Sequence, residues 1–292
     1  MMRRFAISLL VSIACFNACF ASDWKNLHEV ADNKPLPQAL EAVKNNPDSL
    51  NDLYVLGLVY LDLRDDRNSA AAFSKILNKD PNNIEARWGL AEVLRRQHKD
   101  NEAEELLNEV IKADPKFFPA YVTLAYIKHI RMDFEGSLRL TLKVVGAGRD
   151  KVDEANYIRA YALYAGNKGL IAHYGGPISK VINGTIVLPT LKKLERIRAD
   201  SPAVLFGLGT FYLLAPGLAG GDIELAEEYL KKAADADPKL ADIYARLAEL
   251  YRAKGDQAKF EQYINKALEL DPLGELALDI KADGCKYACP GK

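Results

Sequence analysis

Five prolines recur at a fixed interval in this chain of 292 residues, and the interval limits the folds that the chain can adopt. Pro47, Pro81 and Pro115 follow one another every 34 residues, and Pro238 and Pro272 are separated by the same number. A proline ends a helix because it lacks a backbone N–H and its ring clashes with the preceding turn. A repeat of 34 residues is typical of arrays of helix–turn–helix units. The prolines therefore predict an all-α solenoid.

Side chains of alternating size recur at helical spacing before these prolines. Large side chains, mostly apolar, occupy repeat positions 4, 7, 11 and 24, and small residues occupy position 8. The segments 50–83, 84–117 and 241–274 match well, with Leu53, Leu56, Gly57, Tyr60 and Phe73, then Leu90, Ala91, Leu94 and Leu107, then Tyr244, Leu247, Ala248 and Tyr251.

This pattern resembles the tetratricopeptide repeat (TPR), in which small residues let two helices approach closely and large residues fill the space between them. Weaker copies cover residues 118–150, 153–202 and 202–238. The resemblance implies a right-handed TPR-type α-solenoid of about six helix pairs over residues 22–283, with one insertion. It also implies a closing C-terminal helix near residues 273–283.

Residues 1–21 have the pattern of a signal peptide. Arg3 and Arg4 precede an almost wholly apolar run from Phe5 to Phe20, and small residues follow, so we expect cleavage after Ala21. The run of about 16 residues is shorter than the roughly 20 that a membrane helix needs. The pattern therefore predicts a periplasmic or secreted protein.

Two cysteines in this segment leave an alternative open. Cys15 and Cys19 each follow an alanine, as the lipidated cysteine of a bacterial lipoprotein signal does. Neither has a leucine three residues earlier, which that signal also uses. Soluble export is the first hypothesis, and a membrane tether by lipidation is the second.

Only Cys285 and Cys289 remain after the signal peptide is removed. In an oxidising compartment the two can form a small disulfide loop, provided that the segment leaves helical geometry. Gly284 before the pair and Pro290 after it favour such a departure. Zinc and redox pairs usually have two intervening residues rather than three. We therefore predict a structural disulfide in a tail of residues 284–292, with redox or metal chemistry as the alternative.

Charge and motif content argue against several classes of function. The net charge is −1 and no strong basic stripe occurs, so nucleic acid is not an expected partner. The sequence has no nucleophile elbow and no phosphate-binding glycine loop with lysine. We therefore predict a protein that is not an enzyme and needs no metal or cofactor. No second histidine and no cysteine lies three or four residues from any of the four histidines, His28, His98, His129 and His173.

TPR arrays bind partners mainly on the concave face, which the first helices of the repeats line at positions 5, 9, 12 and 13. The resemblance implies a partner- or ligand-binding groove of Tyr54, Trp88, Arg95, Tyr126 and His129. We expect it to hold an extended peptide, or an apolar chain ending in an acid, through aromatic rings and the charge of Arg95. In the alternative interpretation these aromatic side chains only pack against neighbouring helices. A further aromatic stripe at helical spacing is Tyr157, Tyr161 and Tyr164.

Residues 166–189 interrupt the repeat pattern and add about 20 residues to a plain repeat. Their glycines and prolines predict an insertion loop that contains His173 and Tyr174, with a short helix over residues 178–182. Insertions in repeat proteins often carry function because they do not have to pack. An enzyme that uses His173 as a base is therefore the alternative from a different class.

The loop of residues 216–222, with the helix start that follows, is similar to a loop in one group of exported TPR proteins. These are the T-component proteins of tripartite ATP-independent periplasmic (TRAP) transport systems, which assist a solute-binding protein. The simpler interpretation is that Asp222 caps the next helix. The sequence thus predicts a non-catalytic envelope protein that mediates protein–protein interaction. Its partner is a protein of the bacterial envelope, with a solute-binding protein as one candidate, and a small-ligand binder using the concave groove is the alternative.

Overall fold

The computed structural model describes residues 23–290, and this part of the chain contains fifteen α-helices, one short 3-10 helix and no strand. The predicted signal peptide, with Cys15 and Cys19, lies outside the described residues. From residue 23 to residue 290, no helix combines the length and the apolar character needed to cross a membrane.

The helices differ in length, and the two longest belong to one pair. Their bounds are α1 (Trp24–Asp32), α2 (Leu36–Asn45), α3 (Leu50–Asp62), α4 (Asp66–Lys79), α5 (Ile84–Arg96), α6 (Asp100–Ala113), α7 (Phe118–Ile130), α8 (Phe134–Ala147), α9 (Glu154–Tyr174), α10 (Pro177–Glu195), α11 (Pro202–Leu214), η1 (Gly217–Ala219), α12 (Ile223–Ala236), α13 (Ala241–Ala253), α14 (Gln257–Leu270) and α15 (Glu275–Lys281).

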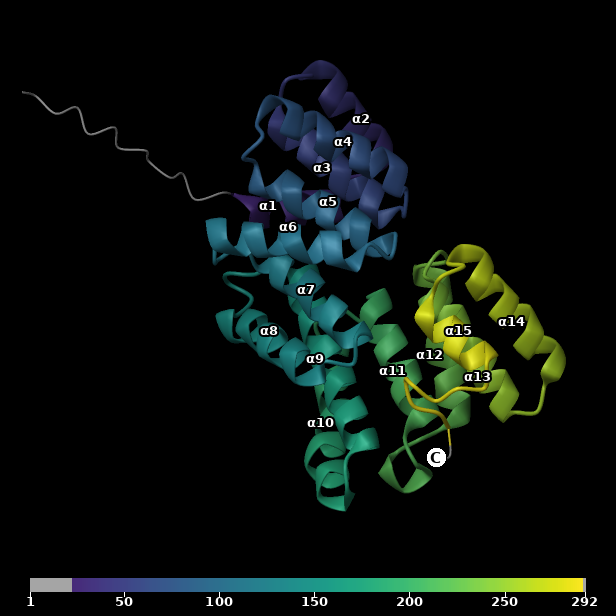
Figure 1. Ribbon diagram of the computed structural model, residues 1–292. Helices are drawn as coiled ribbons and strands as arrows, with labels where there is room; N and C mark the ends of the chain where they lie inside the picture. The colour runs from purple at the N-terminus through teal and green to yellow at the C-terminus, as the bar shows by residue number, and fades with distance from the viewer. Residues whose placement is uncertain (1–22, 291–292) are drawn as a thin grey trace, which may run out of the picture.

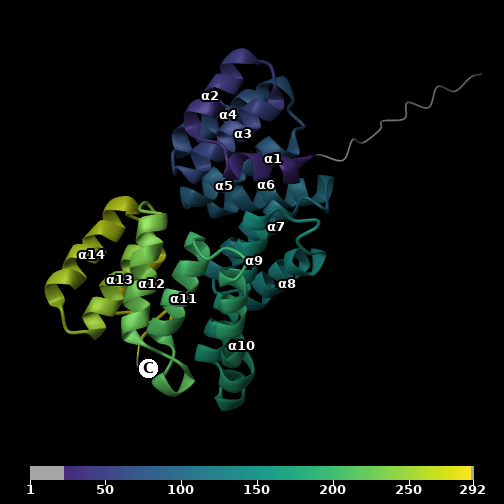
Figure 2. The ribbon, with the colours of Figure 1, turned by 180° about the vertical axis from the view of Figure 1, so that it is seen from behind.

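Helices α3 to α14 form six consecutive helix pairs that stack into a curved array (Figure 1). The first helices of the pairs contact one another in an inner row, whereas the second helices pack on the outside. Figure 2 shows the same array from behind, with α11 to α14 beside α9 and α10. This arrangement confirms the predicted all-α TPR-type solenoid, and α15 is its closing helix.

Small residues allow the helices to approach closely, as the repeat pattern predicts. The Phe73 ring of α4 is fully buried between Gly57 of α3 and Gly89 of α5. A Cβ atom at either glycine would overlap this ring. Replacement of either residue by alanine would therefore force the helices apart.

Turn residues of the early repeats contact the Asp-Pro turns of the late repeats. The Arg64 guanidinium donates to the Asp237 carboxylate, with its closest distance at 2.7 Å. The His98 imidazole lies 2.8 Å from the Asp271 carboxylate. Both contacts join residues 173 positions apart. Successive turns of the first half of the array therefore face successive Asp-Pro turns of the second half.

The predicted insertion loop is wrong, because residues 166–189 extend two helices. Helix α9 continues through Tyr174, and α10 begins at Pro177 and continues through Pro189. A proline in the first turn costs the helix no hydrogen bond, which explains why Pro177 starts α10 rather than ending a helix. Leu170, Val187 and Leu191 are buried in this pair, and their packing offsets the breaking effect of Pro189. We call α9 and α10 together the long hairpin.

Candidate functional site

The predicted groove residues all lie on first helices of the inner row. Tyr54 is on α3, Trp88 and Arg95 are on α5, and Tyr126 and His129 are on α7. The helices thus bring these side chains to neighbouring positions of one face. Each of them, however, is engaged within the chain.

Helix α1 covers the first end of this face. The Nε2 atom of His28 lies 2.8 Å from the Tyr54 hydroxyl, and the His28 ring lies 5.1 Å from the Trp88 ring. Trp24 packs edge-on against Phe117, with ring centroids 5.4 Å apart. Tyr54 and Trp88 are therefore only 2% and 3% exposed. The residues that follow the predicted signal peptide fill this part of the groove, and the repeat pattern alone did not indicate this.

His28 also ties α1 to α9. The Asn156 amide donates to Asp153 and lies 3.2 Å from Nδ1 of His28, which leaves Nε2 to donate to Tyr54. Burial and the charge of Arg159 lower the pKa of His28 to about 3. The imidazole is therefore neutral at physiological pH and serves as a buried hydrogen-bonding group.

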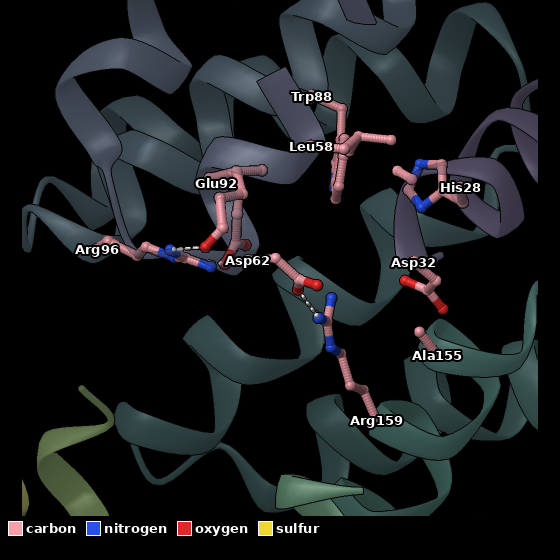
Figure 3. Close-up of a pocket in the computed structure, with 11 residues that line it drawn as sticks. His28, Asp32, Leu58, Asp62, Trp88, Glu92, Arg96, Ala155 and Arg159 are labelled. Carbon is pink, nitrogen blue, oxygen red and sulfur yellow. Dashed lines mark hydrogen bonds and ion pairs between the residues drawn. The ribbon is translucent and has the colours of Figure 1, made fainter. Parts of the chain in front are cut away.

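A small charged cavity remains where α1, α3, α5 and α9 meet (Figure 3). Asp32, Asp62, Glu92, Arg96 and Arg159 line it together with apolar residues. In Figure 3 the Arg159 guanidinium points toward Asp62, and the two lie 3.7 Å apart. The cavity volume of about 30 Å³ accommodates about one water molecule, not a metabolite.

The charge of Arg95 is neutralised inside the array. Its guanidinium donates two hydrogen bonds to Glu92, at 2.6 and 3.1 Å, and lies 4.5 Å from the centre of the Tyr126 ring. Tyr126 in turn donates to Asp242 of α13, and His129 lies 2.8 Å from the Asn167 amide oxygen. These contacts match the alternative interpretation, in which the side chains pack against neighbouring helices.

The C-terminal tail covers the other end of the inner face. The structure joins Cys285 to Cys289 by a disulfide, and the loop turns back over α13. Arg246 donates to the Tyr287 carbonyl at 2.8 Å and pairs with Glu249 at 2.5 Å, and both charged side chains are only 6% exposed. The Tyr287 hydroxyl lies within hydrogen-bond distance of the Ile130 carbonyl on α7. The sequence predicted the disulfide but not that the tail docks.

Replacement of Cys285 and Cys289 by serine is expected to loosen this tail without unfolding the array. The closed loop is short, so the lost chain-entropy term is only about 2 kcal/mol. Hydrogen exchange measured by mass spectrometry should become faster in the tail and in α13 around Arg246, while α3 stays unchanged. Wild-type protein treated with a dithiol reductant should behave in the same way. Unchanged protection of the tail would show that Arg246 holds it without the disulfide.

The two residues expected in the insertion loop lie at the end of α9 instead. Burial and the charge of Lys180 lower the pKa of His173. Tyr174 stacks on Phe134 and donates to the Lys286 carbonyl of the tail at 2.7 Å. Within the described residues, no group of three or more His, Cys, Asp or Glu side chains is arranged to hold a metal ion.

The backbone explains the glycines of the loop between α11 and α12. Gly220 has a φ of +96°, and a Cβ atom at Gly221 would collide with the Ala215 carbonyl oxygen. The Asp222 carboxylate accepts from the backbone N–H groups of Glu224 and Leu225. Asp222 is therefore an N-cap, as the simpler interpretation has it.

Comparison with known proteins gives a consistent result. Family models described as tetratricopeptide repeat match residues 67–125, 218–240 and 241–272. No curated protein sequence matches the chain.

Several solved structures resemble this one at low sequence identity. A tetratricopeptide repeat protein from Parabacteroides merdae is 12% identical, with a TM-score of 0.52 over 87% of this chain and 94% of that one. Pseudomonas aeruginosa pilF is 15% identical, with a TM-score of 0.45 over 86% and 100% of the two chains. The type IV pilus biogenesis factor PilW is 18% identical, with a TM-score of 0.47 over 80% and 98%. The matched repeats and the shared fold show that the chain contains tetratricopeptide repeats and folds as a TPR-type solenoid.

Proposed function

We propose that this chain is a non-catalytic scaffold of the bacterial envelope, which binds a protein partner on a surface that its own ends leave open. The observation that supports this most is the repeat array, because TPR arrays generally serve protein–protein interaction rather than catalysis. The pattern of residues 1–21 supports a periplasmic or secreted location, with lipidation at Cys15 or Cys19 as the alternative.

An aromatic and cationic stripe on the long hairpin is the open surface that best fits such a partner. Tyr161 and Tyr164 are partly exposed, and the amines of Lys193 and Lys168 lie 5.2 and 5.9 Å from their ring centres. Residues 155–194 contain five lysines and arginines and no acidic residue. We call Tyr161, Tyr164, Lys168 and Lys193 the open stripe. This surface suits a partner segment with acidic and aromatic groups.

Two alternative functions have less support. A small ligand in the groove would need more room than the cavity beside α1 offers. A hydrolytic role for His173 would require a partner that orients its ring, whereas the charge acting on it is that of Lys180. A narrower version of the proposal is that this scaffold assists a solute transporter, as proteins of the TRAP T-component group do.

Position-specific photo-crosslinking in cells tests the proposal. A photoreactive amino acid replaces Tyr161 in the open stripe and, as a matched control, Leu142 on the exposed face of α8. We expect one envelope protein to be crosslinked from Tyr161 and not from Leu142. A solute-binding protein or permease would identify a transport accessory, and components of another envelope complex would identify its scaffold. Identical products from both positions, or none, would contradict the proposal.

A further inference from the structure

The tip of the long hairpin exposes a row of apolar side chains. Ile178, Val181 and Ile182 follow one another at helical spacing on α10 and are 75%, 64% and 59% exposed. Packing of the hairpin does not require them, because Leu170 and Val187 already fill the space between its helices. Apolar residues that gather on a surface without a folding role mark an interaction site.

A fourth exposed apolar residue, on another element, lies at the same edge of the molecule. Both views of the ribbon place the hairpin tip and the loop between α11 and α12 at the lower edge (Figures 1 and 2). This loop contains Leu218, which is fully exposed, and a Cβ atom at Gly220 would lie 3.8 Å from Leu188 of α10. The loop therefore packs beside α10, and we call the exposed apolar side chains on this side of the molecule the apolar edge: Ile178, Val181, Ile182 and Leu218.

The hairpin carries positive charge near its tip, which favours an anionic partner. Lys180 is exposed between the apolar side chains, and no acidic residue occurs from residue 155 to residue 194. Glu154 and Glu195 flank this stretch in sequence, at the base of the hairpin. Apolar side chains beside a cation are the combination that binds an anionic lipid surface.

The shape of this edge favours lipid over protein. A stable protein interface buries about 800 Å² on each partner, which calls for a broad complementary face. The hairpin tip instead projects from the array as a narrow end (Figure 1). A lipid surface adapts to such a projection, so a few inserted side chains are enough for reversible binding.

We propose that the apolar edge docks the protein on an anionic membrane surface. Ile178, Val181, Ile182 and Leu218 enter the boundary between headgroups and acyl chains, and the Lys180 ammonium contacts anionic headgroups. This docking is separate from partner binding at the open stripe, which lies nearer the base of the hairpin.

Vesicle co-sedimentation of the chain from Ser22 to Lys292, which cleavage after Ala21 would leave, tests this proposal, because the apolar run Phe5–Phe20 is then absent. We expect the protein to bind vesicles of phosphatidylglycerol and phosphatidylethanolamine and to bind phosphatidylcholine vesicles weakly. The triple variant I178S/V181S/I182S should bind more than about tenfold more weakly. Lys180→Ala should weaken binding to the anionic vesicles about fivefold.

The matched control replaces two similarly exposed leucines elsewhere, Leu142 and Leu273, by serine and should bind like the wild type. Circular dichroism should show equal helix content in all variants. Absence of wild-type binding, or equal binding of the triple variant, would overturn the proposal. Light scattering that shows a wild-type dimer lost in the triple variant would also overturn it, since the edge would then be an interface between copies.

Discussion

Replacement of Trp24 by alanine is expected to lower the free energy of unfolding by about 3–5 kcal/mol, the usual range for a buried tryptophan. The Trp24 side chain is almost fully buried and contacts the rings of Phe117 and Phe118. Its loss leaves a cavity between α1 and α7 that neither helix can close alone. We therefore expect α1 to leave the inner face and to expose Trp88.

Urea denaturation followed by circular dichroism measures the stability, and fluorescence reports the exposure. The chain has two tryptophans, so the emission of the Trp24→Ala variant comes from Trp88 alone. Its emission should shift to longer wavelength in the folded state. The matched control, Trp24→Phe, keeps an aromatic ring against Phe117 and should lose less than about half as much stability. Unshifted emission with wild-type stability would show that α1 does not cover the groove.

The same variant separates the two interpretations of the groove. If α1 is a resident cover, its release turns Tyr54 and Trp88 into accessible aromatic side chains of the kind that TPR arrays use for peptides. A peptide that can bind Tyr54 and Trp88 should then bind the Trp24→Ala variant and not the wild type. The open stripe is not covered by α1, so the crosslinks proposed for Tyr161 should be the same in the Trp24→Ala variant and the wild type.

The sequence was informative wherever neighbours along the chain decide the structure. The 34-residue spacing of the prolines predicts the helix pairs because each helix must end before its proline. Gly57 marks a close approach of α3 and α4 because a repeat packs within itself and on its neighbour. Asp222 is a recognisable cap because capping involves only the next three residues.

Contacts between distant parts of the chain were not predictable in this way. His28 meets Asn156 across 128 residues, and Tyr287 meets Ile130 across 157 residues. Neither contact follows from a repeat pattern, which describes only packing within and between adjacent repeats. The long hairpin was missed for another reason, since the propensity of Pro189 to break a helix is overridden by tertiary packing.

Replacement of Glu92 by glutamine is expected to destabilise the array by about 3 kcal/mol at neutral pH. The Glu92 carboxylate accepts from Arg95 and Arg96 and from the Thr123 hydroxyl at 3.0 Å. Glutamine keeps the shape of this side chain but removes the charge that neutralises the largely buried Arg95 guanidinium, whereas Arg96 keeps its ion pair with Asp66 at 3.0 Å. Removal of one partner from a buried ion pair is costly because the remaining charge stays uncompensated.

The pH dependence gives the sharper test. Burial alone would raise the pKa of Glu92, but the charges of Arg95 and Arg96 and the hydrogen bond from Arg95 outweigh burial and lower it to about 2. The unfolded chain, with an ordinary glutamate pKa near 4.5, therefore takes up the proton first as the pH falls. This stabilisation is complete above about pH 5 and is lost progressively toward about pH 2. A shift of this size corresponds to about 3 kcal/mol.

Urea denaturation at a series of pH values therefore distinguishes the variant from the wild type. The wild type should lose stability steeply below about pH 5, and the Glu92→Gln profile should be flatter and should meet the wild-type profile in acid. The control, Glu105→Gln on the exposed face of α6, should follow the wild type throughout. If the free energy of unfolding changed with pH in the same way for Glu92→Gln and the wild type, Glu92 would not be the acid-sensitive group. Convergence in acid would instead identify Glu92 as the group that holds Arg95 and Arg96 on the inner face.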